Sequence, residues 1–144
     1  MIYTPLTKKA MKIAYEAHKD QTDKGGIPYI YHPIHLAEQM TDERTVCVAL
    51  LHDVVEDTDI TFEQLKEHGF DDEIIEALKV LTYDKSLPYS EYIRNIGSNL
   101  IAKRVKKADL KHNSDLTRLD KADQKVIDRK KKYQASLKIL TDIK

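Results

Sequence analysis

The 144-residue chain is long enough for one globular domain with a single core, and its 41% apolar and 33% charged residues suit a helical protein with a charged surface. It has neither a run of about 18 apolar residues nor an apolar leader, so we expect no membrane span and no secretory signal. Its one cysteine, Cys47, excludes an intrachain disulfide and favours a cytoplasmic location. Residues 99–144 carry 14 basic and 6 acidic side chains, but the net charge of the whole chain is zero. Because the chain has no overall basic excess, solvated Lys-rich helices explain this segment better than nucleic-acid binding does.

Helical periodicity dominates the chain, and the alternating pattern of strands is nearly absent. The spacing of apolar residues predicts helices over residues 7–19, 34–40, 43–55, 61–68, 72–81, 89–96, 100–112 and 121–140. Pro33 suits the first position of its helix, where a missing N–H is harmless. Thr61 and Gln64 form a predicted capping box, and Gly69 ends the helix that follows. These elements predict an all-α protein, a compact multi-helix bundle in which residues 1–144 form one domain.

The strongest local signal lies at the end of the apolar segment 43–55, where His52 and Asp53 are followed by Glu56 and Asp57. Polar groups at the end of such an apolar helix are costly to bury unless they are satisfied. An imidazole beside a carboxylate suits a divalent metal, and further carboxylates can orient a metal-bound water. The alternative is an ordinary helix end that continues into an acidic loop.

Two other pieces are ambiguous when each is taken alone. His32, between Tyr31 and Pro33, begins a helix and could face a pocket or simply pack there. Asp109 and Asn113 lie four residues apart on the helix over 100–112, so they share a face; the alternative is a mid-helix Asp that pairs with a nearby Lys.

Taken in order, these pieces resemble the HD-domain superfamily of metal-dependent phosphohydrolases. Within it the chain resembles the hydrolase domain of RelA/SpoT-type stringent-response enzymes and the small alarmone hydrolases. The matching stretches are residues 17–19, 26–33, 51–57 and 108–113, and the similarity extends over most of residues 5–140.

The resemblance implies a compact all-α HD-domain bundle and assigns roles to individual residues. It implies that one divalent metal, Mn²⁺ first, is held by four side chains: His32, His52, Asp53 and Asp109. It implies that Glu56 and Asp57 position or deprotonate the attacking water and protonate the leaving group. Lys24 and Asn113 match residues that contact the nucleotide. The implied reaction is hydrolysis of the 3′-pyrophosphate of guanosine tetra- or pentaphosphate, (p)ppGpp.

One departure from the family pattern concerns the substrate. Asp23 stands where the family commonly has an Arg that stacks on guanine, so base recognition is expected to differ. An HD-type hydrolase of another nucleotide or phosphate ester is therefore an alternative. A catalytically inactive metal-binding regulatory module is a second alternative, against which Glu56 and Asp57 argue, because a structural site needs no water-activating carboxylates.

Overall fold

The computed structural model describes residues 1–143, and this part of the chain is helical without a β-strand. The helices are α1 (Pro5–His18), α2 (Tyr31–Glu38), α3 (Glu43–Leu51), α4 (Val54–Asp57), α5 (Phe62–Glu67), α6 (Asp72–Leu81), α7 (Tyr89–Gly97), α8 (Leu100–Asn113) and α9 (Gln124–Asp142), with a 3₁₀ turn η1 (Leu116–Arg118) before α9. The expected all-α bundle is confirmed. No helix in residues 1–143 is both long enough and apolar enough to cross a membrane.

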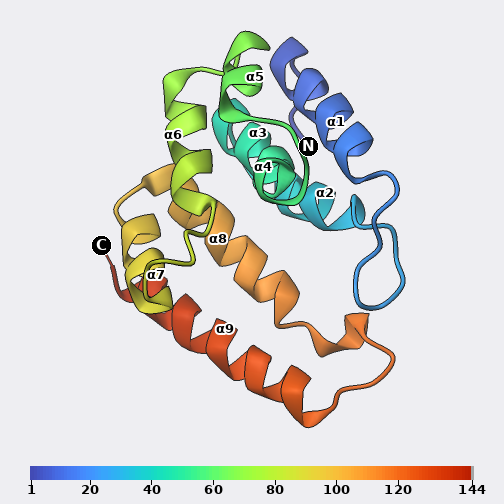
Figure 1. Ribbon diagram of the computed structural model, residues 1–144, viewed down its shortest axis with the longest axis vertical. Helices are drawn as coiled ribbons and strands as arrows, with labels where there is room; N and C mark the ends of the chain where they lie inside the picture. Colours follow the sequence, from blue (N-terminus) through green and yellow to red (C-terminus); the bar gives the residue numbers. More distant parts are fainter. Residues whose placement is uncertain (144) are drawn as a thin grey trace.

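Helix α3 lies at the centre of the bundle and is covered by α1, α2, α6 and α8 (Figure 1). Every residue from Thr45 to Leu51 is buried, which explains why this segment is apolar all round. A fully buried Leu or Val side chain contributes about 1.5–3 kcal/mol through removal of apolar surface from water. The centre of the bundle is therefore a rigid support for residues that follow α3.

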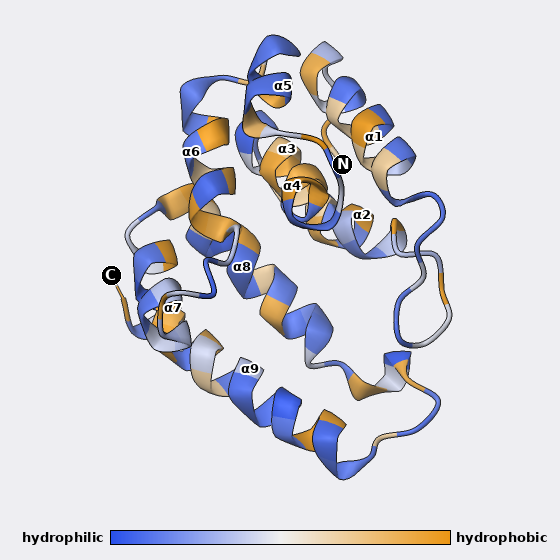
Figure 2. Ribbon diagram, viewed as in Figure 1, coloured by the Kyte–Doolittle hydropathy of each residue, from blue (hydrophilic) through white to orange (hydrophobic). Residues whose placement is uncertain are grey.

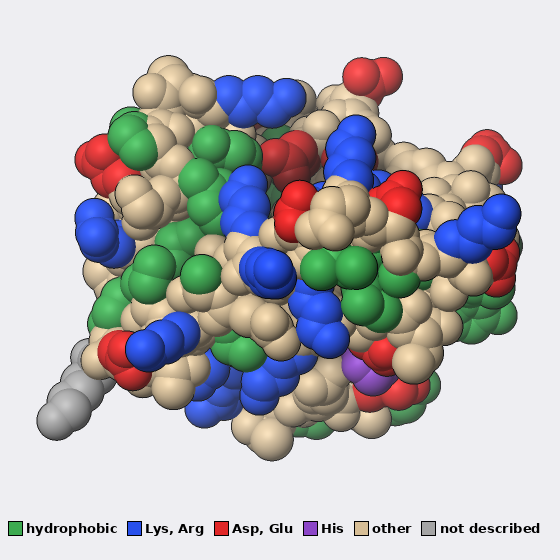
Figure 3. Space-filling view, turned by 90° about the horizontal axis from the view of Figure 1, so that it is seen from below, with side chains coloured by type: hydrophobic (Ala, Val, Ile, Leu, Met, Phe, Trp, Pro, Cys, Tyr) green, Lys and Arg blue, Asp and Glu red, His purple; other side chains and the backbone are tan. Residues whose placement is uncertain are grey.

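Helix α9 lies along the outside of α7 and α8 (Figure 1) and is largely hydrophilic (Figure 2). Only Ser136 and Leu140 of this helix are buried. On the face seen from below, Lys and Arg side chains are spread over the surface with carboxylates between them (Figure 3). The basic excess of the last third of the chain thus lies mainly on a solvated surface.

Local sequence signals determine where several helices begin or end. Thr61 caps α5 by accepting the Gln64 amide at 3.2 Å, and the Gln64 side chain accepts the Thr61 amide at 2.9 Å, so the predicted capping box is confirmed. Gly69 follows this helix with φ of 102°, a conformation that glycine adopts without strain.

Three predicted boundaries were wrong. The helix expected over residues 43–55 divides in two, because Asp53 has φ −106° and ψ 0° and the backbone turns between α3 and α4. Helix α2 begins at Tyr31, so Pro33 is its third residue, still in the first turn where no intrahelical N–H is needed. Helix α9 begins at Gln124, after its cap Asp123, instead of at residue 121.

The loop between α1 and α2 folds back on itself through one antiparallel bridge between Thr22 and Pro28. The Tyr29 amide donates to the Gln21 carbonyl at 2.8 Å, and Gly26 takes the turn with φ of 80°. This closed loop leads directly into α2 and so places Tyr29 and His32 beside the end of α3.

Candidate metal centre and active site

Three buried side chains from three helices converge beside the centre of the bundle. His32 comes from the first turn of α2, His52 directly follows α3, and Asp109 comes from α8. One nitrogen or oxygen atom from each lies within 4.8 Å of the others, which is the arrangement of a metal-ligand set. The helices that carry them pack against one another (Figure 1).

The hydrogen bonding of His52 shows that this set fits a cation. Its Nδ1 lies 2.7 Å from the Ala49 carbonyl oxygen and donates to it, and its Nε2 faces the neighbouring carboxylates. Nε2 is buried and has no hydrogen-bond partner within residues 1–143, yet Asp53 Oδ2 lies 3.0 Å and Asp109 Oδ1 3.7 Å away. Although burial alone would lower it, Asp53 and Asp109 raise the pKa of His52 well above 6.5, so without a metal a proton on Nε2 supplies the positive charge that a bound metal would supply. The donor set of imidazole and carboxylate groups is one that divalent metals accept.

His112, the residue before Asn113 in α8, supports His32. The Nδ1 atoms of the two rings are 2.7 Å apart, and the rings are stacked with centroids 5.0 Å apart. Burial, together with the neighbouring Arg118, lowers the pKa of His112 to about 4, so this ring is neutral and its Nδ1 can accept a hydrogen bond from His32 Nδ1–H. His32 Nε2, 2.9 Å from Asp109 Oδ1, is then oriented toward the proposed metal position. His35 stacks on the outer face of His112 at 4.1 Å.

Asp53 lies beside this three-residue group but not within it. Its Oδ2 accepts a hydrogen bond from the Tyr29 hydroxyl and faces His52 Nε2. Burial alone would raise the pKa of Asp53, but His52 lowers it to about 2, so the carboxylate is ionised as a metal ligand must be. Tyr29 is in turn packed against the buried ring of His18, whose centroid is 4.9 Å away.

Lys106 belongs to this site, and it is the nearby Lys with which Asp109 pairs in the alternative that the sequence left open. Its Nζ donates to Asp109 Oδ2 at 3.0 Å, and its side chain is only 15% exposed. Asn113 donates from Nδ2 to Asp109 Oδ1 at 3.0 Å, which confirms the predicted pairing of these two residues on one face. Although burial alone would raise the pKa of Asp109, Lys106 and the two neighbouring histidines hold it well below 3.8. The spacing of three residues between Lys106 and Asp109 places both side chains on one face of α8.

Glu56 and Asp57 occupy α4, one turn beyond Asp53, and both side chains are exposed. Glu56 Oε1 lies 3.4 Å from the Tyr83 amide nitrogen, which donates to it. Partial burial and the charge of Asp53 raise the pKa of both carboxyl groups above their ordinary values. A carboxylate with a raised pKa is a better proton acceptor near neutral pH than an unperturbed one.

A cavity of about 320 Å³ opens where the loop after α1, the end of α8 and the first half of α9 meet. Lys24 and Asn113, the residues matched to nucleotide contacts, both line it, as do Tyr29 and Arg118. The cavity is therefore adjacent to the candidate metal ligands, since Tyr29 donates to Asp53 and Asn113 donates to Asp109.

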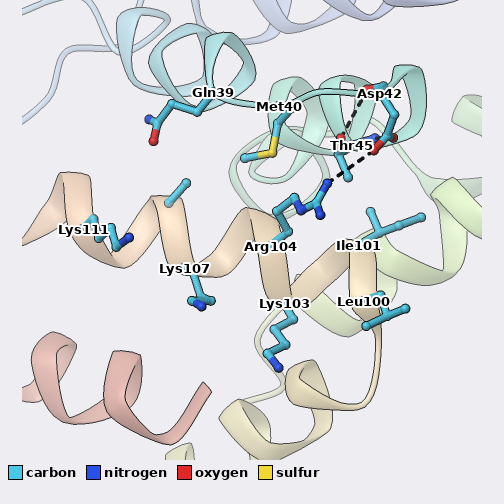
Figure 4. Close-up of a pocket in the computed structure, with 11 residues that line it drawn as sticks. Gln39, Met40, Asp42, Thr45, Leu100, Ile101, Lys103, Arg104, Lys107 and Lys111 are labelled. Carbon is cyan, nitrogen blue, oxygen red and sulfur yellow. Dashed lines mark hydrogen bonds and ion pairs between the residues drawn. The ribbon is translucent and has the colours of Figure 1, made fainter. Parts of the chain in front are cut away.

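A second hollow, of about 560 Å³ and here called the outer hollow, lies between α8 and the segment from the end of α2 to the start of α3 (Figure 4). Lys103, Arg104, Lys107 and Lys111 line it, and Arg104 turns toward Asp42, 3.6 Å away. None of the residues matched to metal binding, catalysis or nucleotide contact lines this hollow. The basic residues of α8 thus divide between the outer hollow and Lys106, which alone among them reaches Asp109 within the described chain.

Comparison with known proteins places these features in a family. Residues 10–91 match the family model described as "HD domain". The chain is 39% identical over 129 residues to the guanosine-3′,5′-bis(diphosphate) 3′-pyrophosphohydrolase MESH1 of Danio rerio, covering 80% of this chain and 71% of that protein. It is 37% identical over 100 residues to the guanosine-3′,5′-bis(diphosphate) 3′-pyrophosphohydrolase of Aquifex aeolicus, covering 66% of this chain but only 14% of that longer protein.

The fold has a counterpart among solved structures. A structure described as a metazoan ortholog of SpoT that hydrolyses ppGpp superposes with a TM-score of 0.77 and 28% sequence identity. The match covers 99% of this chain and 89% of the other.

Proposed function

The chain belongs to the HD domain family and is a metal-dependent phosphohydrolase, and we propose that it removes the 3′-pyrophosphate of guanosine tetra- or pentaphosphate. The similarity to MESH1 of Danio rerio over most of both chains supports this substrate. In the proposed reaction ppGpp and water give GDP and pyrophosphate.

The observation that carries the proposal is the convergence of His32, His52 and Asp109, with His52 Nε2 directed at two carboxylates. We propose that these three residues and Asp53 hold one divalent metal, Mn²⁺ first. The metal, when bound, lowers the pKa of a coordinated water and offsets negative charge on the pyrophosphate.

Glu56 and Asp57 supply the proton transfers in this proposal. Water attacks the phosphorus atom attached to the 3′ oxygen, and the bond between that phosphorus and the 3′ oxygen breaks. One carboxylate accepts the proton of the water, and the other, protonated, donates a proton to the departing 3′ oxygen. Their raised pKa values support both roles, because the acid must hold its proton and the base must accept one near neutral pH.

The remaining parts of the chain support substrate binding in the same proposal. Lys24 and Asn113 line the 320 Å³ cavity, which we propose takes the nucleoside half of the substrate while the 3′-pyrophosphate lies toward the metal ligands. We further propose that residues 1–144 act as one domain, because α2, α3 and α8 form the core and also carry the ligand set. Cytoplasmic location, expected from the single cysteine, belongs to the same proposal.

The test is pyrophosphate release from a nucleotide panel that includes ppGpp, with Mn²⁺ or with chelator, for the wild type and for Asp53→Ala. Asp59→Ala is the matched control, since Asp59 is an exposed carboxylate two residues beyond Asp57. We expect release from ppGpp that chelator and Asp53→Ala abolish and Asp59→Ala leaves unchanged. Metal-dependent activity on another nucleotide alone would keep the mechanism and reject the substrate. Activity unaffected by chelator would reject the metal centre.

A further inference from the structure

The cavity beside the metal centre combines cations with rings. Lys24, Arg118 and Arg129 contribute positive charge, and Tyr29 and Tyr133 contribute aromatic surface. Such a lining suits a ligand that has both phosphates and a planar ring. Asp23 stands where the family commonly has the Arg that stacks on the base, and its carboxylate cannot take that role. Another side chain of the cavity must therefore contact the planar ring.

Both carboxylate oxygens of Asp23 are engaged in contacts within the protein. Its Oδ1 accepts the amides of Gly25 at 2.8 Å and Ile27 at 3.0 Å, and its Oδ2 lies 3.4 Å from Arg118 Nη2. The side chain is 15% exposed, and that of Arg118 is 22% exposed. Asp23 therefore closes its own loop and at the same time holds the guanidinium of Arg118.

The backbones of these two segments are also in direct contact. A Cβ atom built on Gly25 would lie 2.1 Å from the Arg118 carbonyl oxygen, so only glycine allows this approach. The loop after α1 and the turn η1 are thus joined by backbone packing and by the pair of Asp23 and Arg118.

The hydrogen-bonding edge of Arg118 is largely occupied. Nη1 donates to the His112 carbonyl at 2.9 Å and to Asn113 Oδ1 at 3.3 Å, while Nη2 faces Asp23. The Asn113 amide is also occupied at both ends, because its Nδ2 donates to Asp109. Because the protein occupies most of the N–H groups of Arg118, the part of its guanidinium left for a ligand is mainly the flat face. A guanidinium plane stacks well on a planar ring.

We propose that Arg118, clamped by Asp23, is the specificity-determining residue that stacks on the base of the nucleotide substrate. The proposal rests on the function proposed above and adds the residue that selects the nucleoside half. Arg129, whose Nε has no hydrogen-bond partner within residues 1–143, and Lys24 then bind the 5′-phosphates. In this proposal Arg118 takes the place of the Arg that the family commonly has at the position of Asp23.

The experiment compares four variants of the Mn²⁺-loaded protein: Arg118→Ala, Arg118→Lys, Asp23→Asn and Arg104→Ala. The last is the matched control, since Arg104 also pairs with an aspartate, Asp42, but on the outer side of α8. For each, the KM and kcat for ppGpp are measured with the inhibition constants of the two products, GDP and pyrophosphate. Pyrophosphate lacks a base and reports only on the phosphate end of the site.

Loss of the stacking face in Arg118→Ala should raise the KM for ppGpp and the inhibition constant of GDP about tenfold, the size expected for a partly desolvated cation–π contact. The inhibition constant of pyrophosphate should not change. Arg118→Lys keeps the charge but loses the plane, so it should resemble Arg118→Ala. Asp23→Asn keeps the acceptor for the loop amides and should give a smaller increase of about threefold. Arg104→Ala should match the wild type.

Two results would overturn the assignment. If Arg118→Lys behaves as wild type, charge alone matters and there is no stacking platform. If pyrophosphate inhibition weakens as much as GDP inhibition, Arg118 acts on the whole site; a Mn²⁺ titration and a thermal melt of Arg118→Ala report whether α8 has loosened. If the wild type binds GDP but does not hydrolyse ppGpp, only the proposed function is rejected. The role of Arg118 is then decided by the GDP affinities of the same variants, measured by calorimetry. A wild type that does neither rejects both.

Discussion

Replacing Lys106 by methionine removes the cation that offsets the charge of Asp109 in the absence of a metal. The Lys106 ammonium lies 3.0 Å from Asp109 Oδ2, and the two side chains are 15% and 9% exposed. Breaking a buried ion pair by removing one partner costs about 3–5 kcal/mol. Because Lys106 reaches some solvent and Asp109 keeps its contacts with Asn113 and His32, we expect a loss of about 2–3 kcal/mol in the free energy of unfolding.

The loss should depend on metal. With chelator, Lys106→Met should lower the melting temperature by about 6–12 °C, at about 3–4 °C per kcal/mol for a chain of this size. With saturating Mn²⁺ the metal supplies the positive charge beside Asp109, and the variant should melt within about 3 °C of the wild type. The variant should therefore gain more stability from Mn²⁺ than the wild type does.

The measurement is thermal unfolding followed by circular dichroism, with Mn²⁺ or chelator, for the wild type, Lys106→Met and Lys107→Met. Lys107 is the matched control because it lines the outer hollow of α8 and has no ion pair within residues 1–143 (Figure 4). Its replacement should change stability by less than about 0.5 kcal/mol in both conditions. If Lys106→Met is destabilised equally with and without Mn²⁺, Asp109 is not a metal ligand and the reasoning fails.

Four further substitutions test other parts of the site and the fold. Glu56→Gln and Asp57→Asn should each lower kcat for ppGpp about 10²–10⁴-fold with little change in Mn²⁺ affinity, and a loss of Mn²⁺ binding in a fluorescence titration would instead make them ligands. His112→Phe removes the acceptor for its metal-ligand neighbour and should weaken Mn²⁺ binding about 10–100-fold by the same titration, where unchanged affinity would deny it a supporting role. Asp71→Ala removes the cap of α6 and should cost about 1 kcal/mol at pH 7 by urea unfolding. Although burial opposes it, the Ile74 amide and Arg44 lower the pKa of Asp71 below 3.8. The difference in unfolding free energy between wild type and Asp71→Ala should therefore be present above pH 3.8 and fade as the pH falls below it. A difference that persists at about pH 2 would contradict the charge-based part of the effect.

Much of the fold was predictable because helices depend on local signals. The apolar period placed α1, α5, α6, α7 and α8 within a few residues of where they lie, and the capping pair Thr61 and Gln64 fixed the start of α5. The sequence could not show the break between α3 and α4. The segment 43–55 has helical periodicity throughout, and the turn at His52 and Asp53 arises where the His52 ring bonds the Ala49 carbonyl and both side chains face α8.

The candidate metal ligands were predictable in identity but not in arrangement. The resemblance to the HD-domain superfamily implied His32, His52, Asp53 and Asp109, and the structure brings His32, His52 and Asp109 into one group. The place of Asp53, bonded to Tyr29 at the edge of that group, depends on the loop after α1 meeting the end of α3. The assignment of all four as ligands stays a prediction for the metal titrations above.

What the sequence determined by itself was local: helical periods, caps, and the chemistry of residues that are close along the chain. It also showed, at Asp23, that the nucleotide end of the site departs from the family pattern. Only the tertiary structure decided which distant groups meet: His112 lies against His32, and Arg118 lies against Asp23 across 95 positions. The physical reason is that a helix or loop sequence specifies which face is polar, whereas the partner of that face is set by how the helices pack around α3.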